Sequence, residues 1–133
     1  MPSIEMLKSK IHSGTITDAD VNYEGSITIS KELVNAVGIM EYEKVLVVDV
    51  TNGARFETYV IVTNEEGQII VNGAAAKLVS PGDKVIIMAY WFVDLVEDHK
   101  IEEFAKKHGY GSYKKPAIIW LDEDNKIKRS EGL

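Results

Sequence analysis

The chain has 133 residues, of which 45% are hydrophobic and 27% charged, which is enough apolar material for the core of one folded domain. A net charge of −6 argues against nucleic acid as a partner, because neutralising phosphates requires a clustered positive surface. The absence of cysteine excludes disulfides and thiolate chemistry, as expected of a cytoplasmic protein, and the longest apolar stretch, residues 85–93, is too short for a membrane-spanning helix.

The first 38 residues predict two strands and one short helix. A first strand contains Lys10, and a second covers residues 27–29. Ser30 can act as the N-cap of a helix over residues 31–37, and Gly38 can end that helix in a left-handed conformation.

Turn signals separate four further strands. The β-branched run over residues 44–50 predicts a well-buried strand, and the Thr-Asn-Gly turn at 51–53 reverses the chain. Residues 55–63 should therefore run back antiparallel to it. The next turns are expected at 64–67 and 80–83, and the next strands at 68–71 and 84–92.

The C-terminal third predicts a second helix and a hairpin. Apolar residues with helical spacing indicate a helix over residues 99–108, and strands at 117–121 and 126–128 flank an acidic turn. Many short strands separated by turns indicate a mainly β fold, a small barrel with short helices. Residues 79–85 resemble the glycine-aspartate turn of double-psi β-barrels.

The dipeptide Gly25-Ser26 can support chemistry on its own peptide bond. A serine hydroxyl can attack the carbonyl of the preceding residue and turn the amide into an ester, provided that the backbone is strained and donors stabilise the oxyanion. Glycine before the serine accepts unusual backbone angles and has no Cβ to block the attack. By itself, Gly-Ser is also ordinary turn chemistry.

The segment that begins at Arg55 is a second candidate. The guanidinium of Arg55 can hold a carboxylate through two hydrogen bonds. Thr58 and Tyr59 are adjacent in a strand and should point to opposite faces, so a shared site needs a bend or a neighbouring subunit. The alternative is an exposed arginine and a core tyrosine whose hydroxyl lies at the rim.

Asn72 is followed by the small residues Gly73, Ala74 and Ala75. Small side chains let a ligand approach backbone N–H groups closely, especially at the start of a helix. The alternative is a tight strand-to-helix connection with close packing.

Lys10 and His12 lie two residues apart on the first strand and therefore share a face. Lys10 can hold a carboxylate and His12 can make a polar contact, although both can also be solvated strand residues. The three histidines of the chain lack the spacing of metal ligands, so we predict no metal site.

In order and spacing, these segments resemble the aspartate 1-decarboxylase family. The resemblance covers residues 5–93, and a weaker similarity is present at 118–127. It rests on residues 6–12, 23–26, 50–53, 55–56, 58–59 and 72–76. It implies a single double-psi β-barrel domain over residues 1–133. Residues 94–116 depart from the family pattern because they are longer than usual, and we expect them to form a helical insert. The resemblance also implies a homotetramer with active sites between subunits.

The family resemblance further implies a covalent cofactor. The chain would cut itself between Gly25 and Ser26 into fragments 1–25 and 26–133, and Ser26 would become an N-terminal pyruvoyl group. This group forms a Schiff base with L-aspartate and takes up electrons as CO₂ leaves, so that β-alanine is made for pantothenate and coenzyme A. The smaller fragment would remain bound as a strand of the barrel.

The resemblance implies a role for each candidate residue. Tyr59 would donate the proton to the product, and Thr58 would assist cleavage and contact the substrate. Gly73, Ala74 and Ala75 would line the substrate site with Asn72 beside them, and Lys10 and Arg55 would hold the two carboxylates of L-aspartate.

Two other interpretations stay open at this point. The chain could be a binding or assembly barrel that never cuts itself. It could also be a pyruvoyl-dependent decarboxylase that acts on another amino acid, such as glutamate.

Overall fold

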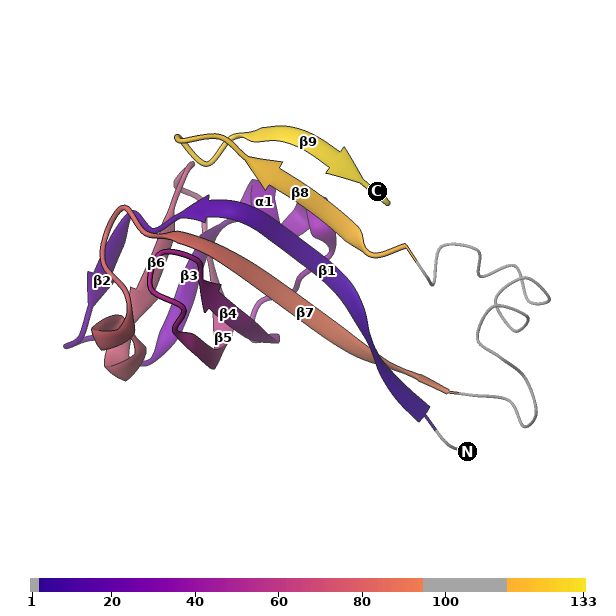
Figure 1. Ribbon diagram of the computed structural model, residues 1–133, viewed down its shortest axis with the longest axis horizontal. Coiled ribbons are helices and arrows are strands. Elements are labelled where there is room, and N and C mark those ends of the chain that lie inside the picture. Colours follow the sequence, from indigo (N-terminus) through magenta and orange to yellow (C-terminus); the bar gives the residue numbers. More distant parts are fainter. Residues whose placement is uncertain (1–2, 95–114) are drawn as a thin grey trace.

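The computed structural model describes residues 3–94 and 115–133, whose strands form one sheet in the order β2-β6-β3-β5-β4-β7-β1-β8-β9 (Figure 1). The long strands β1 and β7 run side by side, and the β8–β9 hairpin lies against β1. The elements are β1 (Ser3–Thr15), β2 (Asp18–Asp20), β3 (Ser26–Ser30), α1 (Lys31–Val37), β4 (Lys44–Asp49), β5 (Arg55–Thr63), β6 (Ile69–Asn72), the 3-10 helix η1 (Gly73–Leu78), β7 (Lys84–Asp94), β8 (Ala117–Leu121) and β9 (Ile127–Glu131).

The sheet curves back on itself. Strand β1 is seventh in the sheet and β2 is first, yet only Ile16 and Thr17 separate them in the chain. In a flat sheet the two strands would be about 29 Å apart, whereas this link spans at most about 10 Å. The N–H of Thr17 donates to the carbonyl of Ile69 on β6, at 2.8 Å. The prediction of a mainly β chain is confirmed, and this closure makes the fold barrel-like.

Every second side chain of these strands points into the interior of the curved sheet and fills it. Ile11, Ile27, Val47, Val60 and Ile87 come from five different strands, and each is fully buried. Because successive side chains of a strand point to opposite faces, the residues between them face outward. The outer face is therefore where polar side chains can gather.

The predicted helix over residues 31–37 is confirmed, and Gly38 ends it with a φ of 72°. Ser30 occupies the N-cap position, but its side chain does not cap the helix. Its hydroxyl instead donates to the carbonyl of Glu65 at 2.7 Å and accepts from the N–H of Gln68 at 2.7 Å. The serine thus joins the start of α1 to the β5–β6 turn.

Three features of the fold differ from the sequence expectation or were not part of it. Strand β4 alternates between buried and half-exposed residues and ends at Asp49, so it is buried on one face only and Val50 is exposed. The short strand β2 was not predicted. The pairs β1–β8, β2–β6 and β3–β5 are parallel, which local turn signals do not indicate.

The second predicted helix, at residues 99–108, lies outside the described residues, as does all of the predicted insert but its ends. Within residues 3–94 and 115–133, no helix is long and apolar enough to cross a membrane.

The predicted turn after β4 is organised by Asp49, whose side chain is fully buried. One of its carboxylate oxygens accepts the N–H groups of Thr51 and Asn52, at 2.8 and 3.1 Å. Burial, and then the nearby Asp83 carboxyl, raise the pKa of the Asp49 carboxyl. Through its hydrogen bonds to Thr51 and Asn52, this carboxyl fixes the β4–β5 turn.

Asn125, in the β8–β9 hairpin, ties together three distant parts of the chain. It is 1% exposed and has a φ of 59°. Its side-chain oxygen accepts the N–H of Thr15 at 2.8 Å, and its nitrogen donates to the carbonyls of Thr15 and Gly67, both at 2.9 Å. The hairpin is thereby fixed to the end of β1 and to the β5–β6 turn.

Replacing Asn125 with alanine should lower the free energy of unfolding by about 2–4 kcal/mol, because three hydrogen bonds are lost and their backbone partners are left unpaired. Urea unfolding followed by tryptophan fluorescence measures this loss. The matched control is Asn35→Ala on the exposed face of α1, which should change stability by less than about 0.5 kcal/mol. A loss below about 1 kcal/mol for Asn125→Ala would contradict the proposed tie.

Candidate active site

Ser26 begins β3 and is 4% exposed. Its antiparallel partner on β6 is Asn72, which is 5% exposed. The Asn72 side-chain nitrogen donates to the Ser26 hydroxyl oxygen at 3.2 Å, and the same hydroxyl lies 3.4 Å from the carbonyl oxygen of Glu24. The serine singled out in the sequence is therefore buried and touches an amide donor 46 residues away.

Gly73 lies directly against Gly25. It has a φ of 76°, and a Cβ at this position would lie 2.5 Å from the Cα of Gly25 and 3.3 Å from the carbonyl oxygen of Tyr23. Real Cβ atoms do not approach other atoms so closely, so only glycine allows η1 to begin here. This contact is the close packing given as the alternative interpretation of the small residues after Asn72, and its partner is the backbone that precedes Ser26; approach of a ligand to these residues stays a prediction.

Gly25 itself does not have a positive φ, and a Cβ added to it would meet no atom within 4 Å. The sequence argument for a glycine before the serine is therefore not supported by crowding or a left-handed conformation at Gly25. In this contact, Gly73 is the residue that must lack a side chain.

Tyr59 lies on the strand beside Ser26. Strands β3 and β5 are parallel with Ile27 opposite Val60, so one step back along both strands places Ser26 beside Tyr59, on the face opposite to the core. Thr58 pairs with the buried Val45 and so points to the other face, as the alternation predicted.

Both Thr58 and Tyr59 nevertheless border one shallow pocket of about 300 Å³, together with Lys44 and Glu57. The Lys44 ammonium and the Glu57 carboxylate lie 2.5 Å apart, and this hydrogen bond raises the pKa of Lys44. The ring of Tyr42 packs near Tyr59, with centroids 6.3 Å apart. The Tyr59 side chain is 37% exposed, so its hydroxyl can reach a small molecule in this hollow.

The two predicted carboxylate-binding residues are not brought together in one chain. Lys10 lies on β1 and Arg55 begins β5, and the strands β7 and β4 lie between them in the sheet. Arg55 is exposed, whereas Lys10 is half-buried. One chain does not supply both cations to one pocket through neighbouring strands.

His12 lies beside the C-terminal hairpin. Burial, and then the positive charge of Lys10, lower the pKa of His12, so its ring is mainly neutral at pH 7. Trp120 is its register partner on β8, with ring centroids 6.3 Å apart, and the guanidinium of Arg129 lies 4.3 Å above the Trp120 ring. Trp120 and Arg129 were not singled out in the sequence, because only the parallel β1–β8 pairing places them here.

Thr28 was also missed. It lies two residues after Ser26 on the same face of β3, and its hydroxyl oxygen accepts a second hydrogen bond from the Asn72 nitrogen, at 3.2 Å. The spacing of two in a strand was the signal that could have identified it.

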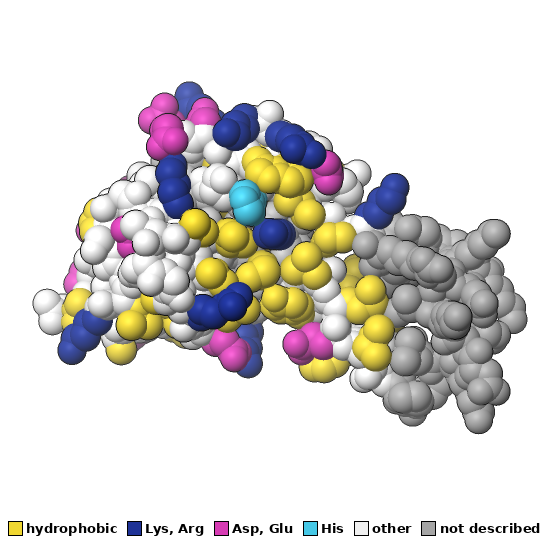
Figure 2. All heavy atoms as spheres, in the orientation of Figure 1, with side chains coloured by type: hydrophobic (Ala, Val, Ile, Leu, Met, Phe, Trp, Pro, Cys, Tyr) yellow, Lys and Arg dark blue, Asp and Glu magenta, His cyan; other side chains and the backbone are white. Residues whose placement is uncertain are grey.

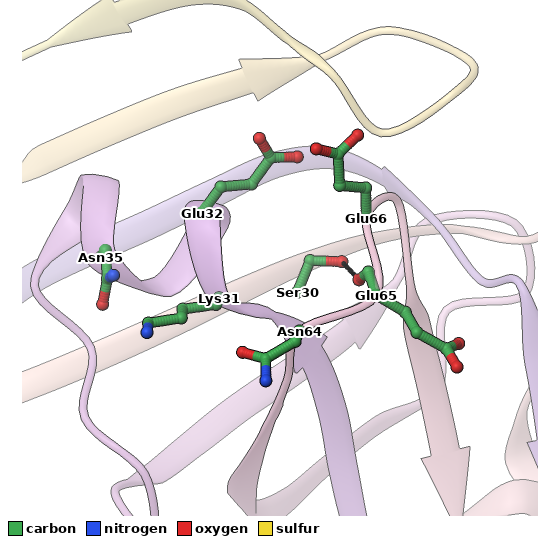
Figure 3. Close-up of a pocket in the computed structure, with 7 residues that line it drawn as sticks. All are labelled: Ser30, Lys31, Glu32, Asn35, Asn64, Glu65 and Glu66. Atoms are coloured by element: carbon green, nitrogen blue, oxygen red, sulfur yellow. Dashed lines mark hydrogen bonds between the residues drawn. The ribbon is translucent and has the colours of Figure 1, made fainter.

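A separate pocket of about 320 Å³ lies at the other end of β3, between the first turn of α1 and the β5–β6 turn (Figure 3). Its wall includes Ser30, whose bond to Glu65 is drawn there, and the carboxylates of Glu32 and Glu66 on opposite sides of the gap. None of the residues predicted for chemistry lines this pocket. In residues 3–94 and 115–133, no group of histidine and acidic side chains could hold a metal ion.

The geometry around Ser26 suits chemistry on the Gly25–Ser26 peptide. A buried hydroxyl follows the Gly25 carbonyl, an amide N–H of Asn72 donates to that hydroxyl, and Gly73 packs against the preceding backbone. A tyrosine hydroxyl on the adjacent strand can exchange a proton with a molecule bound nearby.

Comparison with known proteins agrees with the family resemblance. A family model described as aspartate decarboxylase matches residues 2–128. The chain is 51% identical to an aspartate 1-decarboxylase of Clostridium beijerinckii, over 94% of this chain and 91% of the relative. It is 53% identical to an aspartate 1-decarboxylase of Caldicellulosiruptor saccharolyticus, over 93% and 88%, and 50% identical to one of Campylobacter jejuni, over 92% and 87%.

Gly73→Ala should destabilise the protein by at least about 2 kcal/mol more than Gly53→Ala. Both substitutions place a side chain at a positive φ, at a cost of about 1–2 kcal/mol, but only the alanine at position 73 also collides with Gly25. Urea unfolding of the two variants measures the difference. Equal losses would show that the backbone around Gly25 moves aside freely.

Proposed function

The chain belongs to the aspartate decarboxylase family, and on that premise we propose how its own residues carry out the reaction. The chain is a lyase that converts L-aspartate into β-alanine and CO₂, and β-alanine is the precursor of pantothenate. The observation that carries the proposal is the contact between the Asn72 amide and the buried Ser26 hydroxyl, beside the close approach of Gly73 to Gly25.

Maturation begins with the chain cutting itself. The Ser26 oxygen adds to the carbonyl carbon of Gly25, and the C–N bond of that peptide breaks as the proton passes to the nitrogen. An ester is left, and its elimination releases Gly25 with a carboxylate and leaves a dehydroalanine at position 26. Water then hydrolyses the imine form of this residue, so that ammonia leaves and a pyruvoyl group remains. The Asn72 N–H donates to the Ser26 oxygen at 3.2 Å and can stabilise the charge that develops on this oxygen when it leaves with Gly25 during elimination of the ester.

The surroundings of Ser26 fit such a group. Position 26 is buried at the start of a strand that is paired on both sides, and an amide donor already contacts its side chain. The pyruvoyl carbonyl would bind the amine of the substrate and withdraw the electron pair left by CO₂.

The substrate is oriented by the remaining residues. Gly73, Ala74 and Ala75 offer a surface without bulky side chains beside position 26, with Asn72 next to them. Tyr59, from the adjacent strand, delivers the proton to the α-carbon of the product. Thr58 assists cleavage and contacts the substrate from the pocket that it shares with Tyr59.

Arg55 and Lys10 would each hold one carboxylate of L-aspartate. Their separation in the sheet supports a site between subunits, at which Arg55 of one chain and Lys10 of the next converge on one substrate. We therefore propose a homotetramer of double-psi barrels that works in the cytoplasm.

An exposed hydrophobic surface also supports assembly. Figure 2 shows hydrophobic side chains gathered over β1 and β7, and the exposed aromatic residues of β7 include Tyr90 and Phe92. Soluble proteins rarely leave a large patch of this kind in contact with water.

After cleavage, fragment 1–25 would stay bound through β1. The strand pairs with both β7 and β8, and its Lys8 ammonium lies 2.6 Å from the Glu43 carboxylate and 3.0 Å from the carbonyl of Gly38. These contacts all join the small fragment to the large one.

Ser26→Ala should leave one intact, folded and inactive chain, because no hydroxyl remains to attack Gly25. Mass spectrometry under denaturing conditions should find fragments 1–25 and 26–133 for the natural chain and one mass for the variant. Ser80→Ala, which changes an exposed turn serine, is the control and should still be cut. An uncut natural chain would favour a non-enzymatic barrel and refute the proposed maturation.

Tyr59→Phe should still be cut but should lose decarboxylation by at least about 100-fold, because the proton donor is missing. Release of CO₂ from L-aspartate measures turnover, and Tyr90→Phe is the matched control for loss of a tyrosine hydroxyl. Turnover within about threefold of the natural enzyme would remove Tyr59 from the proposed role.

In the same assay, L-glutamate should release no CO₂. Equal turnover of both amino acids would contradict the proposed specificity for aspartate.

A further inference from the structure

The Asn72 side chain lies between two hydroxyl groups of β3. Its nitrogen donates to the Ser26 oxygen and to the Thr28 oxygen, at 3.2 Å each. A carboxamide nitrogen carries two hydrogens, so both bonds can form at once. With both acceptors in place, the plane of the carboxamide is fixed relative to β3.

The two acceptors differ in how firmly they are held. Serine has three accessible rotamers, and the Ser26 oxygen must move to attack Gly25. Thr28 is β-branched, which restricts its side-chain rotation, and its backbone is paired with Ile70 on one side and Ile61 on the other. The Thr28 hydroxyl is therefore the fixed reference point and the Ser26 hydroxyl the mobile one.

We propose that Thr28 is a positioning residue for maturation: its hydroxyl holds the Asn72 carboxamide so that the other N–H points at the Ser26 oxygen. This inference rests on the proposed self-cleavage. It adds to that proposal a residue that does not touch the scissile peptide and acts only through Asn72.

The hydrogen bond from Asn72 to the Ser26 oxygen acts in both steps of the proposed maturation. As the Ser26 oxygen bonds to the Gly25 carbon and the peptide C–N bond breaks, one N–H of Asn72 stays on the reacting oxygen. When the ester is later eliminated, that oxygen leaves as part of the Gly25 carboxylate, and the N–H stabilises its growing negative charge. Thr28 remains as the acceptor that keeps the carboxamide in place after Ser26 has lost its oxygen.

The surroundings allow Thr28 to be substituted without a collision. Thr28 is half-buried and faces a hollow of about 270 Å³, which it lines together with Asp18, Asp20 and Asn72. Valine has the same branched shape as threonine and lacks only the acceptor oxygen. Thr28→Val thus removes the hydrogen bond with little change in packing.

The test is the rate at which freshly synthesised full-length chain is converted into two fragments, followed by mass spectrometry under denaturing conditions. Thr28→Val should slow this conversion about fivefold, as expected for loss of one neutral hydrogen bond that orients a catalytic group. Thr28→Ser, which keeps the hydroxyl, should restore most of the rate. Thr63→Val makes the same chemical change at the far end of β5 and should have no effect.

A double-mutant cycle separates positioning from a general effect on packing. If Thr28 acts through Asn72, Thr28→Val should cause no further slowing in an Asn72→Ala background. An equal slowing in both backgrounds, or a natural rate for Thr28→Val, would overturn the inference. If Thr28→Val fails to fold in the uncut Ser26→Ala background, Thr28→Ala takes its place in the cycle.

The outcomes also distinguish this inference from the proposed function. If the natural chain is never cut, both fail. If the natural chain is cut and Thr28→Val is cut equally fast, only the role of Thr28 fails.

Discussion

The antiparallel pairing of β3 with β6 is the constraint on which the site depends. Its register places Ser26 opposite Asn72, and the same register brings Gly73, the next residue after β6, against Gly25. A slip by one residue would turn Ser26 into the core and remove both contacts. The register is protected by the alternate residues Ile27 and Val71, which are fully buried on the other face. Core packing thus sets the position of the Ser26 hydroxyl.

The first 25 residues make many non-covalent contacts with the rest of the chain. Strand β1 pairs along its length with β7 and in part with β8, and Lys8 reaches the Glu43 carboxylate beyond α1. Asn125 holds the end of the strand through two bonds to Thr15. The proposed cleavage after Gly25 would require such contacts, because the free fragment would otherwise gain conformational entropy by leaving.

The candidate site residues differ in how buried and how rigidly held they are. Ser26 and Asn72 are buried and fixed by strand pairing, whereas Tyr59 borders an open pocket and Arg55 is exposed at the start of β5. The proposed bond cleavage within the chain requires the buried, fixed pair of Ser26 and Asn72. Capture of a small dicarboxylic acid requires the open part and a second positive charge, which the sheet order keeps away on β1. In the proposed tetramer, a neighbouring subunit would bring that second charge to the site.

Local signals in the sequence determined the helix over residues 31–37 and the strand over 55–63, because capping, alternation and turn chemistry act over a few residues. The same local reading singled out the dipeptide Gly25-Ser26 as a candidate site. Only the tertiary structure decided that Asn72 meets Ser26 across 46 residues, and that Asn125 reaches Thr15 across 110. Those contacts depend on the register and on parallel pairs such as β3–β5, which the packing of the whole core selects and no local pattern encodes.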